Sequence, residues 1–245
     1  GKITATDCTI NVTEGSDSFP GNNGAEGGVV TIDGSTDGVA VMVAYIADSS
    51  DYYYAFPSLA AALEFAKPGQ TVTLLRDVKS SEILVINKNI NLDGNGKTLT
   101  STAGRAINVS GASKATIKNL TINASGERAI NIIQNSKEVV IENVTATAAN
   151  YTVNVAGSAP GVQVAISNST LTGLNVVNVA APSAEVTVSE STLNCNDKNA
   201  SESYAALCLN KDAVGAKITA TGCTINIPEG SGSSESRNGA EGGEI

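Results

Sequence analysis

The segment ATIKNLTIN at residues 115–123 decides the fold, because its pattern recurs three more times along the chain. The other copies are VVIENVTAT at 139–147, VAISNSTLT at 164–172 and VTVSESTLN at 186–194. Apolar and polar residues alternate in each copy with a period of two, which is typical of strands. One threonine keeps its place in every copy and in the flanking segments: Thr98, Thr121, Thr145, Thr170, Thr192 and Thr224. The spacings are 23, 24, 25, 22 and 32 residues.

A second strand recurs in step with the first. It is AINV at 106–109, AINI at 129–132, TVNV at 152–155, VVNV at 176–179 and ALCL at 206–209. We expect the second and fourth residues of each to face inward and the third to face outward. Repeats of 22–25 residues with two or three short strands each are typical of the coils of a parallel β-helix. One coil cannot bury its apolar face alone, so stacking of coils makes the core.

Asparagine occupies two aligned columns of this pattern. The first column holds the outward residue of the second strand: Asn108, Asn131, Asn154 and Asn178, followed by Cys208. The second lies at a predicted turn: Asn119, Asn143 and Asn168. Stacked amide side chains can donate to and accept from one another along such a column. We interpret both columns as structural ladders before any ligand role.

The N-terminal part of the repeat unit has a different pattern. Residues 38–46 and 52–56 are predicted strands, and PSLAAALEFAKPG at 57–69 is a short amphipathic helix bounded by prolines. The run TVTLL at 71–75 opens the series of coils. An open end of a β-helix exposes its core and an unpaired strand edge. We therefore expect the helix to cap the N-terminal end.

A longer period covers the whole chain. Residues 1–30 align without gaps to residues 216–245, with 19 identities in the 30 pairs. This predicts a piece of a longer protein with tandem modules of about 215 residues. The expected organisation is a copy of the terminal coil and linker of a preceding module at 1–30, N-terminal strands and a capping helix at 31–70, β-helix coils at 71–228 and an inter-module linker at 229–245.

Composition excludes several classes of function. The net charge of −9 and the lack of any basic run argue against nucleic acid and anionic membrane surfaces as partners. The chain has no His, which removes Ser/His and Cys/His nucleophile systems and most zinc sites. No stretch of 18 apolar residues exists, so we expect no membrane insertion in this segment. Asp93-Gly94-Asn95-Gly96 fits a tight turn better than a calcium loop. We expect no cofactor and no metal.

The run YYYAFPSLAAALEFAKPGQTVTLLRDV at 52–78 and ILVINKNINLDGNGKTLTS at 83–101 resembles a known unit. It is similar to the start of pectin-lyase-like β-helix repeat domains in large surface proteins of Gram-positive, often gut-dwelling, bacteria. The matching positions are Tyr54, Leu59, Ala62, Gly69, Thr71, Leu74, Leu75, Asp77, Val78, Gly94, Gly96, Lys97 and Leu99. Pro57-Ser58 and Ala60-Ala61 depart from the pattern. The resemblance covers about residues 38–225 and implies a right-handed parallel β-helix on an extracellular bacterial surface, with signal and anchor outside this fragment.

The pectin-lyase fold also contains polysaccharide lyases and glycosidases, so a carbohydrate-active enzyme is the first alternative. Fold alone does not establish activity. A glycosidase needs two carboxylates at matching register on nearby coils, and Glu142 and Glu190 look isolated in the sequence. Arg105 and Arg128 lie one coil apart and, with Tyr151, are the candidate ligand contacts. No catalytic constellation emerges, so we expect no enzyme.

The cysteines allow one intramolecular pair. Cys8 and Cys223 occupy the same position of successive modules, which leaves three cysteines in each module. Cys195 and Cys208 belong to one coil and are the candidates for a disulfide.

Together these observations predict a non-catalytic structural or adhesive module of a repetitive bacterial surface protein, either a stalk or a binding surface. The expected partners are neighbouring modules or head-to-tail copies, and a host glycan or host protein. A second alternative to the adhesive module is a self-assembling head-to-tail filament, in which the copied coil at the N-terminus docks on the end of another module.

Overall fold

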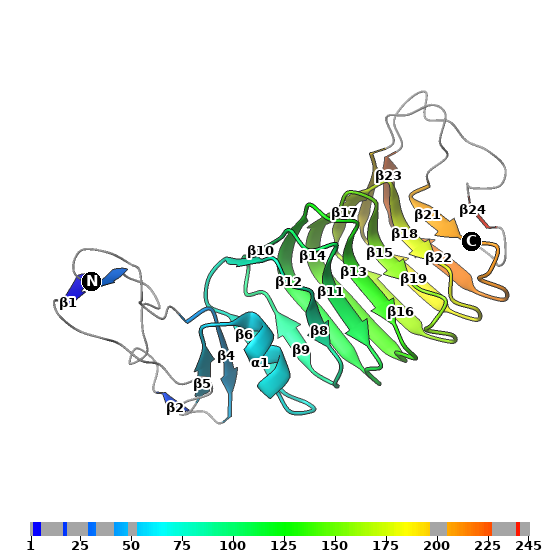
Figure 1. Ribbon diagram of the computed structural model, residues 1–245. Helices are drawn as coiled ribbons and strands as arrows, with labels where there is room; N and C mark the ends of the chain where they lie inside the picture. The colour runs from blue at the N-terminus through cyan, green and yellow to red at the C-terminus, as the bar shows by residue number, and fades with distance from the viewer. Residues whose placement is uncertain are drawn as a thin grey trace.

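The computed structural model describes residues 42–48, 53–196 and 205–226, and the backbone of four short strands at 2–5, 17–18, 29–32 and 239–240. The described chain is an all-β parallel solenoid of about five turns with one short helix. Figure 1 shows the strands stacked as successive rungs between the helix and the C-terminal coils. The predicted parallel β-helix is thus confirmed, and its handedness stays a prediction.

Each turn of the solenoid contributes a strand to three faces. Face 1 contains β6 (Thr71–Leu74), β9 (Asn91–Asp93), the first halves of β12 (Ala115–Ala124) and β14 (Glu138–Thr147), β16 (Gln163–Ser167), β19 (Glu185–Ser189) and β22 (Lys217–Thr221). Face 2 contains β7 (Val78–Ser80), β10 (Thr98–Ser101), the second halves of β12 and β14, β17 (Thr170–Gly173), β20 (Thr192–Cys195) and β23 (Thr224–Asn226). Face 3 contains β8 (Leu84–Ile86), β11 (Arg105–Ser110), β13 (Arg128–Ile133), β15 (Tyr151–Val155), β18 (Asn175–Val179), β21 (Leu207–Leu209) and β24 (Gly239–Ala240).

Neighbouring coils are in register over all three faces. Thr98 pairs with Thr121 on face 2, Thr121 pairs with Thr145, and the series continues to Thr224. Parallel strands in register place equivalent side chains about 4.8 Å apart along the solenoid. Inward positions form one continuous aliphatic core, in which Ile117, Val144 and Leu171 are each 0% exposed. The small aliphatic residues of the sequence pattern suffice to fill this thin interior.

The N-terminal end is closed by antiparallel strands and the helix. β4 (Ala44–Ala47) pairs antiparallel with β5 (Tyr53–Phe56) and with β6, so the parallel sheet ends there in a hairpin. Helix α1 (Leu59–Phe65) begins at Ser58, whose hydroxyl accepts a hydrogen bond from the Ala61 N–H. Its buried residues Leu59 and Leu63 belong to the solenoid core. α1 lies at this end of the stack in Figure 1, the position expected of a cap.

Three further strands precede the cap. β1 (Lys2–Ala5) pairs parallel with β3 (Val29–Ile32), and β2 (Asp17–Ser18) pairs antiparallel with β5. Of the predicted strand at 38–46, residues 38–41 lie outside the described residues, and β4 runs from Ala44 to Ala47. Most of the predicted units at 1–30 and 229–245 lies outside the described residues. Cys8 lies outside them too.

Candidate ligand-binding groove

The boundary between faces 1 and 2 is a one-residue corner repeated in successive coils. Asn119, Asn143 and Asn168 occupy it with positive φ angles of 53°, 51° and 50°. Glu190 and Gly222 continue the column with φ of 46° and 65°. Asparagine enters this left-handed region more easily than other residues with a Cβ atom, because its short side chain can hydrogen-bond locally. The second asparagine column therefore marks the positions where the strand path bends.

The corner amides form a short ladder. Asn143 Nδ2 donates to Asn119 Oδ1 at 2.9 Å, and Asn119 Nδ2 donates to Asp93 Oδ1 at 3.1 Å. Asn168 lies at the next register position, and its backbone N–H donates to the Ser189 carbonyl at 3.2 Å. The ladder thus links Asp93, Asn119 and Asn143 across three coils.

The turn before β10 packs tightly on this ladder. The Gly94 N–H donates to the Lys118 carbonyl at 2.8 Å, and the Gly96 N–H donates to the Asn119 carbonyl at 2.9 Å. A Cβ atom at Gly94 would lie 2.5 Å from the Asn119 carbonyl oxygen, so only glycine allows this approach. Gly96 instead faces open space and has a φ of 72°.

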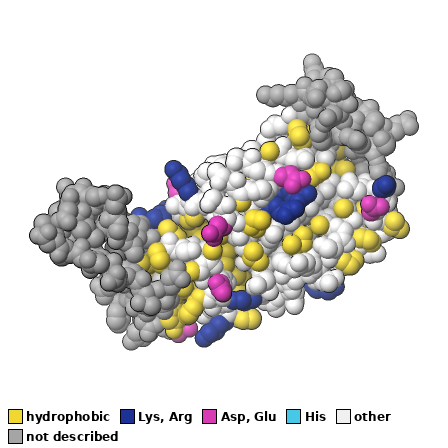
Figure 2. All heavy atoms as spheres, in the orientation of Figure 1, with side chains coloured by type: hydrophobic (Ala, Val, Ile, Leu, Met, Phe, Trp, Pro, Cys, Tyr) yellow, Lys and Arg dark blue, Asp and Glu magenta, His cyan; other side chains and the backbone are white. Residues whose placement is uncertain are grey.

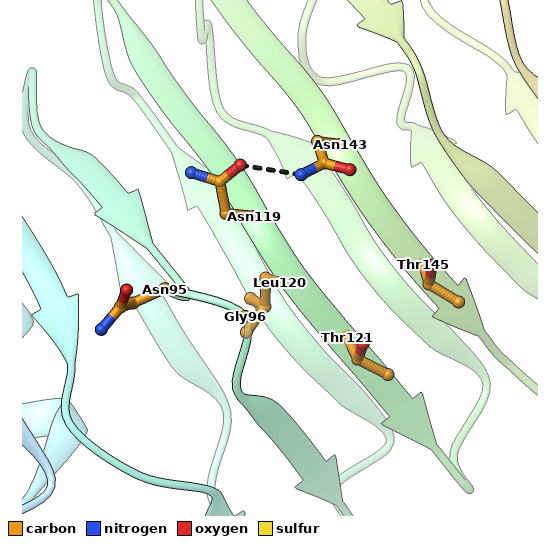
Figure 3. A pocket seen from close by; sticks show the side chains of 7 residues that line it. All are labelled: Asn95, Gly96, Asn119, Leu120, Thr121, Asn143 and Thr145. Carbon is orange, nitrogen blue, oxygen red and sulfur yellow. Dashed lines mark hydrogen bonds between the residues drawn. The ribbon is translucent and has the colours of Figure 1, made fainter.

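A hollow of about 410 Å³ opens beside this turn. It is lined by Asn95, Gly96, Asn119, Leu120, Thr121, Asn143 and Thr145 (Figure 3). The two threonines lie side by side on neighbouring strands of face 2, and the two ladder amides lie above them at the corner. We call this hollow the corner groove.

The lining of the corner groove is polar and carries no formal charge. The hydroxyls of Thr121 and Thr145 have no hydrogen-bond partner among the described residues. Amides and hydroxyls both donate and accept, which matches the hydroxyl groups of a neutral sugar. In Figure 2, charged side chains form only isolated spots on the visible face, between uncharged and hydrophobic ones. The groove can therefore bind an uncharged polar ligand by hydrogen bonds.

A column of charged residues borders the groove on face 1. Register places Asp93, Lys118 and Glu142 on three successive coils. Lys118 Nζ lies 3.4 Å from Asp93 Oδ2. Burial alone would raise the pKa of the Asp93 carboxyl, but hydrogen bonds from the Asn95 N–H, Asn119 and Lys118 lower it below its ordinary value. Asp93 is thus held as a carboxylate and is a poor general acid, although it lies two coils from Glu142.

The first asparagine column forms a longer ladder on face 3. Asn131 donates to Asn108 at 2.9 Å, Asn154 to Asn131 at 2.8 Å, and Asn178 to Asn154 at 2.7 Å, in each case from Nδ2 to Oδ1. Val85 at the end of this column is 41% exposed, so the column points out of the core. Asn131, Asn154 and Asn178 are nevertheless only 3%, 4% and 5% exposed. This ladder stabilises the stack and offers little surface to a ligand.

Arg105, Arg128 and Tyr151 lie together in one column at the start of face 3. The Arg128 guanidinium carbon lies 5.3 Å from the centre of the Tyr151 ring, and Arg128 Nη2 lies 3.0 Å from Glu127 Oε1. The Nε atoms of both arginines are buried without a hydrogen-bond partner among the described residues. The three residues do not line the corner groove. Their role as ligand contacts stays a prediction.

Cys195 and Cys208 lie at the end of β20 and in the middle of β21, and both are buried. The Cys195 thiol donates to the Leu174 carbonyl at 3.0 Å, and the Cys208 thiol lies 3.4 Å from Asn210 Oδ1. The disulfide between them stays a prediction. Cys223 continues a column that holds buried Ser169 and Ser191. Its thiol donates to the Thr221 carbonyl, two residues earlier, and each of the two serine hydroxyls also donates to the carbonyl two residues earlier.

Sequence reasoning missed the corner groove and its charged border. The available signal was the constant Thr column two residues after the Asn column. The charged border is not apparent in the sequence, because the turn at 94–97 makes the segment from Asp93 to Thr98 two residues longer than the paired segment of the next coil. An alignment on the threonine column therefore does not place Asp93 in register with Glu142.

Comparison with family models, with curated proteins and with solved structures finds no match to this chain. Among the described residues, no group of three or more acidic, Cys or His side chains could hold a metal ion. The described part of the chain also contains no helix long and apolar enough to cross a membrane.

Proposed function

We propose that this chain is a non-catalytic module of an extracellular bacterial surface protein, which serves as a stalk and binds a neutral glycan in the corner groove. The observation that carries the proposal is the uncharged, hydroxyl- and amide-lined hollow of about 410 Å³. Its size falls within the range of ligand pockets, and its lining supplies paired donors and acceptors at the spacing of the coils. The resemblance to repeat domains of Gram-positive surface proteins supports the location.

The repeat supports the stalk role. Parallel coils in register form a rod that lengthens with each added unit, and residues 216–245 repeat residues 1–30 with 19 identities. The charged border argues against hydrolysis, because Lys118 pairs with Asp93 and the pKa of Asp93 is lowered. A general acid of a glycosidase needs a raised pKa.

A glycan array followed by binding measurements on the best neutral glycan tests the proposal. The double variant Thr121→Val/Thr145→Val removes two hydroxyls from the groove and keeps the side-chain shape. The matched control is Thr170→Val/Thr192→Val, in the same column and outside the groove. Two lost hydrogen bonds of about 0.5–1.5 kcal/mol each predict roughly 5- to 150-fold weaker binding for the groove variant.

Three outcomes would contradict the proposal. They are equal losses in both double variants, no binding to any neutral glycan, and release of oligosaccharides from a polysaccharide panel. The last result would favour the carbohydrate-active enzyme.

A further inference from the structure

Among the described strands, faces 1 and 2 end at β22 and β23, whereas on face 3 β24 pairs with β21. Two inward positions that are buried in the preceding coils are exposed in the last described coil, although Ile218 of β22 is 0% exposed. Ile225 is 44% exposed, whereas the equivalent residues Leu99, Ile122, Ala146, Leu171 and Leu193 are at most 1% exposed. Ala220 is exposed, whereas Ile117, Ile141, Ile166 and Val188 in the same column are at most 1% exposed. The last described coil therefore exposes one core position on face 1, Ala220, and one on face 2, Ile225.

One edge of β22 has no partner strand in the described part of the chain. Among the described strands β22 pairs only with β19. The Lys217 N–H donates to the Ala184 carbonyl on that side, and the Thr221 carbonyl accepts from the Glu190 N–H. Successive peptide groups of a strand point to opposite sides, so the backbone N–H groups of Ile218 and Ala220 face the open edge. An unpaired edge of this kind is a template for another strand.

The N-terminal strands show which segment fits this edge. β1 has the sequence KITA and pairs parallel with β3, Lys2 with Val29 and Ala5 with Ile32. β22 begins with the same four residues at 217–220. β3 therefore pairs with a sequence that the chain presents twice. It can pair with β22 in the same register, Lys217 with Val29 and Ala220 with Ile32.

That register also extends face 1 at this end with apolar residues. It places Val30 at the register position of Ile218 and Ile32 at that of Ala220. Apolar residues would then continue the inward columns of face 1 by one coil. β1–β3 is a two-stranded sheet, which is marginal by itself, whereas β22 is anchored in a fifteen-stranded sheet. If β3 leaves β1 and pairs with β22, the number of strand pairs stays the same and more apolar surface is buried.

We infer that β3 of one copy of this chain adds to the open edge of β22 of another copy, parallel and in the register above. β3 precedes β4 at the capped end, and β22 lies at the other end of the stack (Figure 1), so the partner is a second molecule or the next module in tandem. Such a head-to-tail contact does not close on itself and builds a filament. β1 competes with β22 for the same strand and limits this assembly.

Sedimentation velocity over a wide range of concentration tests the inference. Deletion of residues 1–5 removes the competitor and should tighten self-association by about tenfold or more, since β3 no longer has to leave β1. In that deletion variant, Ala220→Pro removes an N–H from the open edge without touching the bonds to β19, and should abolish association. Ala220→Ser keeps the N–H and is the matched control. Unchanged thermal unfolding shows that each variant folds.

Deletion of residues 1–32 should leave a monomer at every concentration. The inference is overturned if deletion of residues 1–5 weakens association or leaves it unchanged, because β1 itself would then be the docking strand or neither strand would dock. Association that survives Ala220→Pro overturns it too. The inference deepens the stalk role proposed above and rests on it. The two tests can fail independently, because a protein that stays monomeric but binds glycan contradicts only the end-to-end contact.

Discussion

Replacement of Asn154 by Ala probes how much the buried ladder of face 3 contributes to stability. Asn154 is 4% exposed, donates to Asn131 and accepts from Asn178. The substitution leaves Asn131 Oδ1 and Asn178 Nδ2 without their ladder partner, at residues that are 3% and 5% exposed. Each buried polar group left without a partner costs about 1–3 kcal/mol. We therefore expect the free energy of unfolding to fall by about 2–6 kcal/mol.

The matched control is Asn226→Ala at the exposed end of a third ladder. Asn226 Nδ2 donates to Asn194 Oδ1 at 2.8 Å, and water can replace that bond because Asn226 is exposed. Its loss should cost less than about 1 kcal/mol. The assay is equilibrium urea unfolding followed by far-ultraviolet circular dichroism, with calorimetry as a second probe for two-state behaviour. Adding Asn178→Ala to Asn154→Ala should lower the free energy of unfolding by less than Asn154→Ala does alone. The second substitution removes the Asn178 amide donor that the first one leaves without a partner. Equal costs for Asn154→Ala and Asn226→Ala would refute the assignment of a stabilising role to buried amide stacking.

Two further predictions concern the turn that borders the corner groove. Because the pKa of Asp93 is lowered in the folded state, its carboxylate stabilises the fold above the unfolded pKa of about 4, and this contribution is lost as pH falls through the folded pKa. The stability difference between the wild type and Asp93→Asn should therefore shrink from pH 6 towards pH 3 in urea titrations, and a constant difference would contradict the assignment. Gly94→Ala should lower the thermal midpoint more than Gly104→Ala, because a Cβ at Gly94 would lie 2.5 Å from the Asn119 carbonyl oxygen and a Cβ at Gly104 meets nothing within 4 Å. Equal midpoints would show that the turn relaxes away from the ladder.

The coil repeat was predictable from sequence for a simple physical reason. A parallel stack in register repeats the same environment every coil, so each register position demands the same kind of residue in every copy. Thr121 and Thr145 pair in the structure as their spacing predicts. The helix was also predictable, because its proline boundaries and apolar face are local features, and α1 occupies Leu59–Phe65.

The positions of the site depended on long-range geometry. The sequence predicts a turn at Asn119, but nothing in the alternating pattern shows that β12 continues through that turn onto a second face. The hollow forms because the turn containing Gly96 packs against the next coil, 23 residues further along the chain at Asn119. Sequence periodicity contains no information about the empty space between such segments.

The sequence by itself determined the architecture: an all-β stack of coils, an aliphatic core, a helical cap and two asparagine columns. Hydrophobic alternation and recurrence encode these features, because every coil must satisfy the same packing and hydrogen-bonding needs as its neighbours. Only the tertiary structure decided which faces are open. Burial of the face 3 ladder, the uncharged corner groove and the exposed edge at Ala220 depend on which coil or turn lies next to each residue. Neighbours of that kind are distant in sequence, and their contacts appear only once the coils are stacked.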